Sequence, residues 1–366
     1  MRTLVASDLH LAAGFDGDLV RRPRFREILL REVEGADEVV LLGDVIELRD
    51  RPLDEALEIA RPFFDDLADA AGTTSVVLVP GNHDHQLIAP WLERRRLDSG
   101  GPLGLEQRAR PDVGIAAHLA RLMPRAQLTL AYPGVWIRPR TYATHGHYLD
   151  CHITVPTFER LAIAVVEKLA GALPDGLRST DDYEAVQAPL YGLLYGVAQG
   201  AHRPRRGLGE NASARVWEAV HGRNGRGPGL RGRLLGLLVL PGLVTAANRL
   251  GLGPLRWDIS MPEIRRAGVR AMGELVGRLD IGADEVIFGH THRRGPLNGE
   301  PGWELPGGPR LVNTGSWVFA RALVGSSSRG SVFWPGTVVM VDDDDPPRPR
   351  HLLDDLERDE LRIARG

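Results

Sequence analysis

Five short motifs carry side chains of the kinds that bind metal ions. In chain order they are Asp8-Leu9-His10, Gly43-Asp44, Gly81-Asn82-His83-Asp84, His145-Gly146-His147 and Gly289-His290-Thr291-His292. Carboxylates, imidazoles and an amide oxygen together suit borderline divalent metals such as Mn, Fe or Zn better than Ca or Mg. The motifs therefore predict a metal centre assembled from distant parts of the chain.

The spacing within two of these motifs favours shared coordination. Asp8 and His10 are two residues apart, and on a strand such residues point to one side and can reach the same ion. His290 and His292 repeat this spacing, although the turn that they open could divide them between two ions. Asp44 follows a glycine, which lets the backbone approach the centre closely. Its carboxylate could then bridge two cations. Asn82 follows Gly81 in the same way.

Short apolar strands would position these motifs. Runs rich in Val and Leu are typical of buried strands, and they cover Thr3–Ser7, Glu38–Gly43, Ser75–Pro80, Thr141–Thr144, Glu285–Gly289, Arg310–Asn313 and Thr337–Val341. Five of them end at the motifs, and sites in open α/β sheets form beyond the carboxyl ends of strands. Helical patterns lie between several strands, so we expect an α/β fold. These patterns are Arg24–Glu34, Leu53–Ala71 and Pro262–Leu279.

The rest of the chain is organised around this core. Gln127–Tyr132 and Val135–Arg138 predict a hairpin, because Pro133-Gly134 between them is a common turn sequence. We expect the core to comprise residues 1–150 and 258–345, interrupted by a helical insertion or cap at residues 151–257. The remaining tail, residues 346–366, is expected to contain a helix from Leu352 to Ala364.

Composition narrows the class of protein. A net charge of −3 over 366 residues argues against a protein dedicated to coating nucleic acid. The single cysteine, Cys151, excludes an internal disulfide framework. The chain runs from Met1 into an apolar strand pattern without a charged and then apolar leader. We therefore expect a cytoplasmic protein.

The five motifs, taken in order, resemble those of the calcineurin-like metallophosphoesterase family. The resemblance covers residues 1–150 and 281–320. It implies a β-sandwich flanked by helices, and two divalent ions, Mn first among them, that hydrolyse phosphate esters or anhydrides. Carried over by position, it assigns Asp8, His10, Asp44 and His292 to one metal, and Asp44, Asn82, His145 and His290 to the other.

The same resemblance implies the catalytic roles. Two ions roughly 3.5–4 Å apart can hold both the phosphoryl oxygens and a bridging hydroxide that attacks phosphorus. His83 would then act as the acid that meets the leaving group. Glu47 is expected to orient His83, while Asp84 is expected in a turn or beside the ligands. His147 could support a ligand or line the substrate pocket.

The insertion carries the best sequence evidence about the substrate. Arg203–Arg233 holds eight Arg and two Glu, and Leu234–Asn248 holds no charged residue. One interpretation is an apolar cap helix on the core. The other is a basic and apolar cap that holds an amphipathic or lipid-linked phosphate, or touches a membrane surface through residues 203–248.

Three alternatives for the function stay open. The stretch Gly43-Asp44-Val45-Ile46-Glu47 resembles the Gly-Asp-x-x-Glu form of bacterial UDP-diacylglucosamine pyrophosphatases, which carry Arg where this chain has His83. A soluble nucleotide phosphodiesterase would use the same centre. A scaffold that kept the fold without catalysis is the third alternative, and the presence of His83 together with every ligand favours a hydrolase over it.

Overall fold

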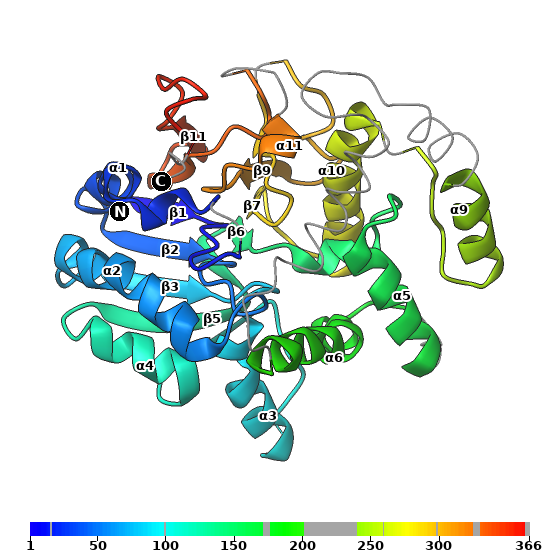
Figure 1. Cartoon of the computed structure of the whole chain (residues 1–366), viewed down its shortest axis with the longest axis horizontal. Coiled ribbons are helices and arrows are strands. Elements are labelled where there is room, and N and C mark those ends of the chain that lie inside the picture. Colours follow the sequence, from blue (N-terminus) through cyan, green and yellow to red (C-terminus); the bar gives the residue numbers. More distant parts are fainter. Residues whose placement is uncertain are drawn as a thin grey trace.

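The computed structural model in Figure 1 describes residues 1–14, 17–98, 100–170, 176–200, 240–258, 260–297, 299–324 and 330–362. Its centre is a continuous path of paired strands that folds into two sheets. One strand, β5 (Gln127–Arg138), belongs to both sheets and connects them.

The first sheet has a parallel centre and antiparallel edges. β1, β2, β3 and the beginning of β5 run parallel in that order. β10 lies antiparallel beside β1, with β11 outside it, and β4 pairs with β5. The bounds are β1 (Thr3–Ala6), β2 (Glu38–Leu42), β3 (Ser75–Val79), β4 (Glu106–Ala109), β10 (Thr337–Val341) and β11 (Arg348–His351).

The second sheet begins where β5 leaves the first. The end of β5 pairs antiparallel with β6, which is followed by β7 and β9 in parallel and by the short edge strand β8. Their bounds are β6 (Thr141–Thr144), β7 (Glu285–Phe288), β8 (Arg294–Gly295) and β9 (Arg310–Thr314).

Alternation along the strands produces the layers. Successive side chains of a strand point to opposite faces. Val40 and Leu42 of β2 accordingly join Ile287 of β7 in an apolar core between the two sheets. Val39 and Leu41 point the other way, into the core under the helices that cover the first sheet. Because both faces of each central strand are covered, these positions carry apolar side chains.

Helices cover both outer faces (Figure 1). α1 (Pro23–Val33), α2 (Leu53–Ala71) and α4 (Gly114–Leu122) pack on the first sheet, and α10 (Met261–Arg278) packs on the second. α5 (Phe158–Ala170) and α6 (Thr180–Gln199) pack against each other and contribute to the apolar core of the second sheet. Shorter elements are η1 (Leu19–Arg21), η2 (His85–Leu87), α3 (Ala89–Leu97), η3 (His147–Cys151), α9 (Leu240–Arg249) and α11 (Arg321–Val324). The predicted β-sandwich flanked by helices is thereby confirmed.

The predicted hairpin across Pro133-Gly134 is wrong. β5 continues through both residues, pairing first with β3 and β4 and then with β6. Gly134 serves close packing instead of a turn, because a Cβ there would overlap the Tyr142 hydroxyl and lie 2.5 Å from the carbonyl oxygen of Ala143. The proline stands where the strand passes from one sheet to the other.

The C-terminal segment also differs from its prediction. Residues 352–362 form turns where we expected a helix from Leu352, and β11 extends the first sheet beyond residue 345. Tertiary contacts hold these turns: Leu353 is fully buried, its carbonyl accepts from the indole of Trp334 at 3.0 Å, and the amide of Leu352 donates to Gly336 at 2.8 Å. Such contacts outweigh a weak helical preference. Among the described helices, none combines the length and the apolar character that crossing a membrane requires.

Candidate metal centre

The loops that follow β1, β2, β3, β6 and β7 meet at one end of the sandwich. The amide of Asp8 donates to the carbonyl of Gly43 at 3.0 Å, and that of His10 donates to the carbonyl of Asp44 at 2.8 Å. On the second sheet, the amide of Gly289 donates to the carbonyl of His145 at 3.1 Å. These bonds continue the strand pairing into the loops and join the first motif to the second and the fourth to the fifth. Asp44 links the others, because its carboxylate accepts from the amide of His83 and lies 3.1 Å from His145 Nε2.

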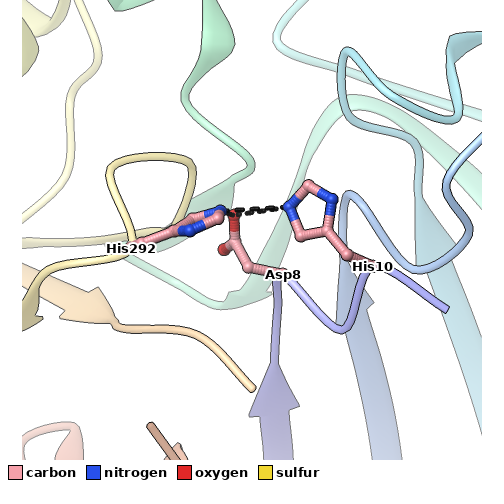
Figure 2. A group of neighbouring side chains, drawn as sticks. All are labelled: Asp8, His10 and His292. Carbon is pink, nitrogen blue, oxygen red and sulfur yellow. Dashed lines mark hydrogen bonds and ion pairs between the residues drawn. The ribbon is translucent and has the colours of Figure 1, made fainter. Parts of the chain in front are cut away.

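Asp8, His10 and His292 form the first cluster, which Figure 2 shows at the end of β1. His292 Nε2 lies 3.0 Å from His10 Nε2 and 3.2 Å from Asp8 Oδ1. His10 Nε2 lies 4.0 Å from the same carboxylate oxygen. All three side chains are buried, and one ligand atom of each lies within 4.8 Å of the others.

Asp44, His145 and His290 form the second cluster, with Asn82 beside them. His145 Nε2 lies 3.1 Å from Asp44 Oδ2 and 3.2 Å from Asn82 Oδ1. Asp44 also belongs to a third grouping, with His10 and His83. Its Oδ2 is 3.6 Å from His10 Nε2, which places this carboxylate between the two clusters.

The outer nitrogen of each of three histidines meets an oxygen. His145 Nδ1 donates to the carbonyl of Leu42 at 2.9 Å, and His290 Nε2 donates to Asp150 Oδ1 at 2.9 Å. His10 Nδ1 lies 3.3 Å from Glu47 Oε2. A proton held on the outer nitrogen leaves the inner nitrogen with its lone pair directed into the cluster, which is the tautomer that a metal requires.

The orientation of the Asn82 amide indicates whether a cation fits in the second cluster. Its oxygen faces His145 Nε2, Asp44 Oδ2 and His290 Nδ1; with the amide turned around, its nitrogen would donate to all three at 3.2 Å. Lone pairs that converge in a buried place repel one another unless a positive charge lies among them. The donor set of an amide, a carboxylate and two imidazoles therefore fits a divalent cation.

Charge in the centre leads to the same conclusion. Burial disfavours charge, yet Asp44 raises the pKa of His145 to about 9. Against the same effect of burial, His145 and His83 hold the pKa of Asp44 well below its usual range. For His290 as well, burial is outweighed by Asp150, which raises its pKa. The carboxylates thus stay ionised and attract positive charge, which protons or metal ions can supply.

The backbone is strained at the candidate ligands. Asp8, His10, Asp44, His290 and His292 have φ angles of 54°, 45°, 52°, 67° and 53°. Each such conformation costs a non-glycine residue on the order of 1–3 kcal/mol and persists only where its surroundings impose it. Strain of this kind gathers at functional sites, so its concentration on five candidate ligands is independent support for a site.

Two glycines make room for the ligands. A Cβ at Gly43, where φ is +83°, would overlap the ring of His145. A Cβ at Gly81 would overlap Asp44 Oδ1. The glycine before each of these motifs is therefore required by close approach, as expected from the sequence.

Glu47 connects a candidate ligand with the candidate acid. Its Oε2 hydrogen-bonds to Nδ1 of His83 and lies 3.3 Å from Nδ1 of His10. Although burial opposes ionisation, the two imidazoles lower the pKa of Glu47. The backbone amide of His83 donates to Asp44 Oδ1 at 2.9 Å, and its Nε2 lies 3.9 Å from Asp44 Oδ2. The free edge of His83 therefore faces the clusters.

Asp84 and His147 lie behind the ligands. The Asp84 carboxylate accepts from the amides of Gly81 at 2.7 Å and Val45 at 2.8 Å, which joins the loops after β2 and β3. Burial, with the neighbouring Asp44, raises the pKa of Asp84 to about 6. His147 is buried with its Nε2 3.2 Å from the Tyr132 hydroxyl, and burial together with His145 lowers its pKa well below the usual value. Neither belongs to a ligand cluster.

Asp150, the partner of His290, is not among the site residues predicted from the sequence. It stands five residues after His145, inside η3, and its side chain is buried. A carboxylate near a metal motif was the available signal, but nothing local shows that a residue 140 positions further along would meet it.

Comparison with known proteins agrees with this geometry. Residues 1–173 match the family described as calcineurin-like phosphoesterase. A search of curated proteins finds no match. The matched segment contains four of the five motifs, and the fold brings the fifth, at residues 289–292, against them. The match and the arrangement of Asp and His ligands together show that residues 1–173 are similar to the calcineurin-like phosphoesterase family, whose members are metal-dependent hydrolases of phosphoesters.

Proposed function

We propose that the protein hydrolyses phosphate esters or anhydrides with two divalent metal ions. The observation that carries the proposal is the position of Asp44, whose Oδ2 faces His10 on one side and His145 on the other. A carboxylate shared by two clusters is what a pair of neighbouring ions requires. The ligands would be Asp8, His10, Asp44 and His292 for one ion and Asp44, Asn82, His145 and His290 for the other.

We propose manganese as the first choice among the metals that this donor set suits. Imidazole with carboxylate and amide oxygen suits Mn, Fe and Zn, whereas Ca and Mg prefer oxygen ligands alone. When bound, the two ions would lower the pKa of water and offset negative charge on the phosphoryl oxygens.

His83 would supply the proton for the leaving group. Glu47 holds its Nδ1, which leaves Nε2 directed toward the clusters. The proton passes from Nε2 to the leaving oxygen as the bond to phosphorus breaks. Glu47 also supports His10, so one carboxylate positions both the acid and a ligand.

The substrate would be a small phosphodiester or a diphosphate, including a lipid-linked one. Support for an amphipathic substrate comes from Leu243, Leu250 and Trp257, which are about three-fifths exposed at 61%, 60% and 58%. The basic stretch Arg203–Arg233 lies outside the described residues, but its sequence adds six net positive charges to the same insertion. A peripheral membrane contact through residues 203–248 belongs to this proposal, and a soluble nucleotide diester is its competitor.

Hydrolysis of bis-p-nitrophenyl phosphate by the full chain tests the reaction. We expect turnover to rise with added Mn²⁺ until two ions are bound per chain, and Asp44→Asn to lose most of it. The control is Asp69→Asn, because the Asp69 side chain is 82% exposed on α2. Full wild-type turnover with one ion per chain would contradict the paired centre, and no turnover with two ions bound would favour the scaffold. Screening nucleotide, sugar and lipid-linked diphosphates then separates the substrate classes.

A further inference from the structure

We propose that Arg49 binds the phosphoryl group of the substrate and that Glu159, from α5, holds the Arg49 guanidinium in place. This inference rests on the proposed function and adds to it a recognition element in which the insertion takes part. Neither residue belongs to the five motifs.

Arg49 lies beside the second cluster. It stands two residues after Glu47, and its backbone amide donates to Glu47 Oε1 at 2.8 Å. Its side chain is only 6% exposed. Nη1 reaches the outer end of the Asn82 amide at a distance of 3.0 Å. One amide group therefore separates this guanidinium from Asp44, His145 and His290.

Metal coordination by Asn82 would change what Arg49 needs. Turned around, the amide accepts from Arg49 through its oxygen and donates to the cluster through its nitrogen. With its oxygen on a cation, its NH₂ group faces Nη1 instead, and two donors cannot hydrogen-bond to each other. Metal binding thus removes an acceptor from Arg49, and a phosphoryl oxygen held by the same cation is a suitable replacement.

Charge supports an anion at this place. Arginine stays protonated in proteins. A buried guanidinium next to two metal ions would be repelled by them unless an anion lay between. The planar fork of a guanidinium matches the paired oxygens of phosphate.

Glu159 extends the site into the insertion. Its Oε1 accepts from Arg49 Nη2 at 3.4 Å, and its side chain is 14% exposed. Through this ion pair α5 reaches the loop after β2. Because one edge of the guanidinium is turned toward Glu159, the other edge faces Asn82 and the second cluster. Glu159 is thus a positioning residue.

The test compares four variants of the full chain loaded with Mn²⁺: Arg49→Met, Arg49→Lys, Glu159→Gln and, as control, Arg160→Met. Arg160 is the neighbouring buried arginine of α5, and it pairs with Glu167 and the carbonyl of Gly253 instead. Bound Mn²⁺ is counted, and the binding of inorganic phosphate is measured by calorimetry. KM and kcat for bis-p-nitrophenyl phosphate are measured alongside.

We expect all four variants to keep their Mn²⁺. Arg49→Met should weaken phosphate binding by about tenfold to a hundredfold, since hydrogen bonds to charged groups are worth roughly 1.5–3 kcal/mol. Arg49→Lys should fall between it and the wild type, because charge remains without the fork. Glu159→Gln should weaken phosphate binding less than Arg49→Met and raise KM more than it lowers kcat. Arg160→Met should match the wild type.

Two results would overturn the inference. One is phosphate binding within twofold of the wild type in both Arg49 variants, and the other is loss of Mn²⁺ from them, which would mean that Arg49 supports Asn82 alone. If Arg49→Met does not fold, Arg49→Lys and Glu159→Gln carry the test. Failure of the proposed function is a different outcome, because it would show as a wild-type protein that holds two ions and hydrolyses nothing.

Discussion

Replacing Asp150 probes the second cluster without touching a ligand. Asp150 Oδ1 accepts from His290 Nε2 at 2.9 Å, and the carboxylate is 4% exposed. Outer partners of metal-bound histidines change metal affinity or activity by about tenfold to a hundredfold. Asp150→Asn keeps an acceptor oxygen but loses the charge that raises the pKa of His290. We therefore expect the lower end of that range, about tenfold or 1.4 kcal/mol.

Asp150→Ala removes the acceptor as well, so its effect should approach a hundredfold. Only the ion held by Asp44, Asn82, His145 and His290 should weaken, because the ligand that Asp150 holds is His290. The assay is calorimetric titration of the metal-free protein with Mn²⁺, followed by turnover at limiting and at saturating Mn²⁺. Turnover should be lost at limiting Mn²⁺ and largely recovered at saturation.

A matched control is Glu184→Gln. Glu184 is another buried carboxylate, and it accepts from the Tyr148 hydroxyl at 2.9 Å and from His85 Nε2 at 3.1 Å without touching a candidate ligand. Its replacement should leave both Mn²⁺ affinities unchanged. Unchanged affinities in Asp150→Ala would refute the reasoning, as would equal weakening of both ions.

Three further predictions follow from the geometry. His83→Ala should keep its metal but hydrolyse substrates with poor leaving groups about a hundredfold more slowly or worse. Hydrolysis of p-nitrophenyl esters should slow less, because p-nitrophenolate needs little help from an acid. Equal slowing of both kinds of substrate would reject the acid role. Gly81→Ala should lower the affinity for Mn²⁺, because the added methyl group overlaps Asp44 Oδ1. Gly277→Ala is the control, since a Cβ at Gly277 has nothing within 4 Å. Equal affinities of the two variants in a Mn²⁺ titration would contradict this prediction. Burial, helped by Arg278, lowers the pKa of His152 to about 4, so protonation favours the unfolded chain and stability should fall as the pH drops from about 6.5 to 4. In His152→Gln, the midpoint of urea unfolding should depend less on pH between about 6.5 and 4. An unchanged pH dependence would show that His152 is not responsible.

The amino-acid pattern alone predicts the strands and the positions of the candidate ligands. Apolar runs such as Glu38–Gly43 and Ser75–Pro80 correspond to β2 and β3, since a strand covered on both faces has to be apolar along its whole length. The motifs follow these strands because a buried run must end before charged side chains begin. The glycines before Asp44 and Asn82 likewise indicate, from sequence alone, that the backbone approaches the ligands closely there.

Long-range contacts determine the structure of β5 and of the C-terminal tail, which the local sequence pattern does not predict. Pro133-Gly134 resembles a turn, but neighbours on both sides keep β5 extended. The tail after His351 has a helical pattern, but the burial of Leu353 holds it in turns. In both cases long-range contacts are stronger than local preference.

The pairs that complete the centre also depend on the folded chain. Asp150 meets His290, and Arg49 meets Glu159, across 140 and 110 positions of sequence. The sequence around each of these residues shows no motif that marks it as part of the centre. A carboxylate looks the same in sequence whichever cation or imidazole it will face, because its role comes from distance and burial, and those exist only once the two sheets have packed together.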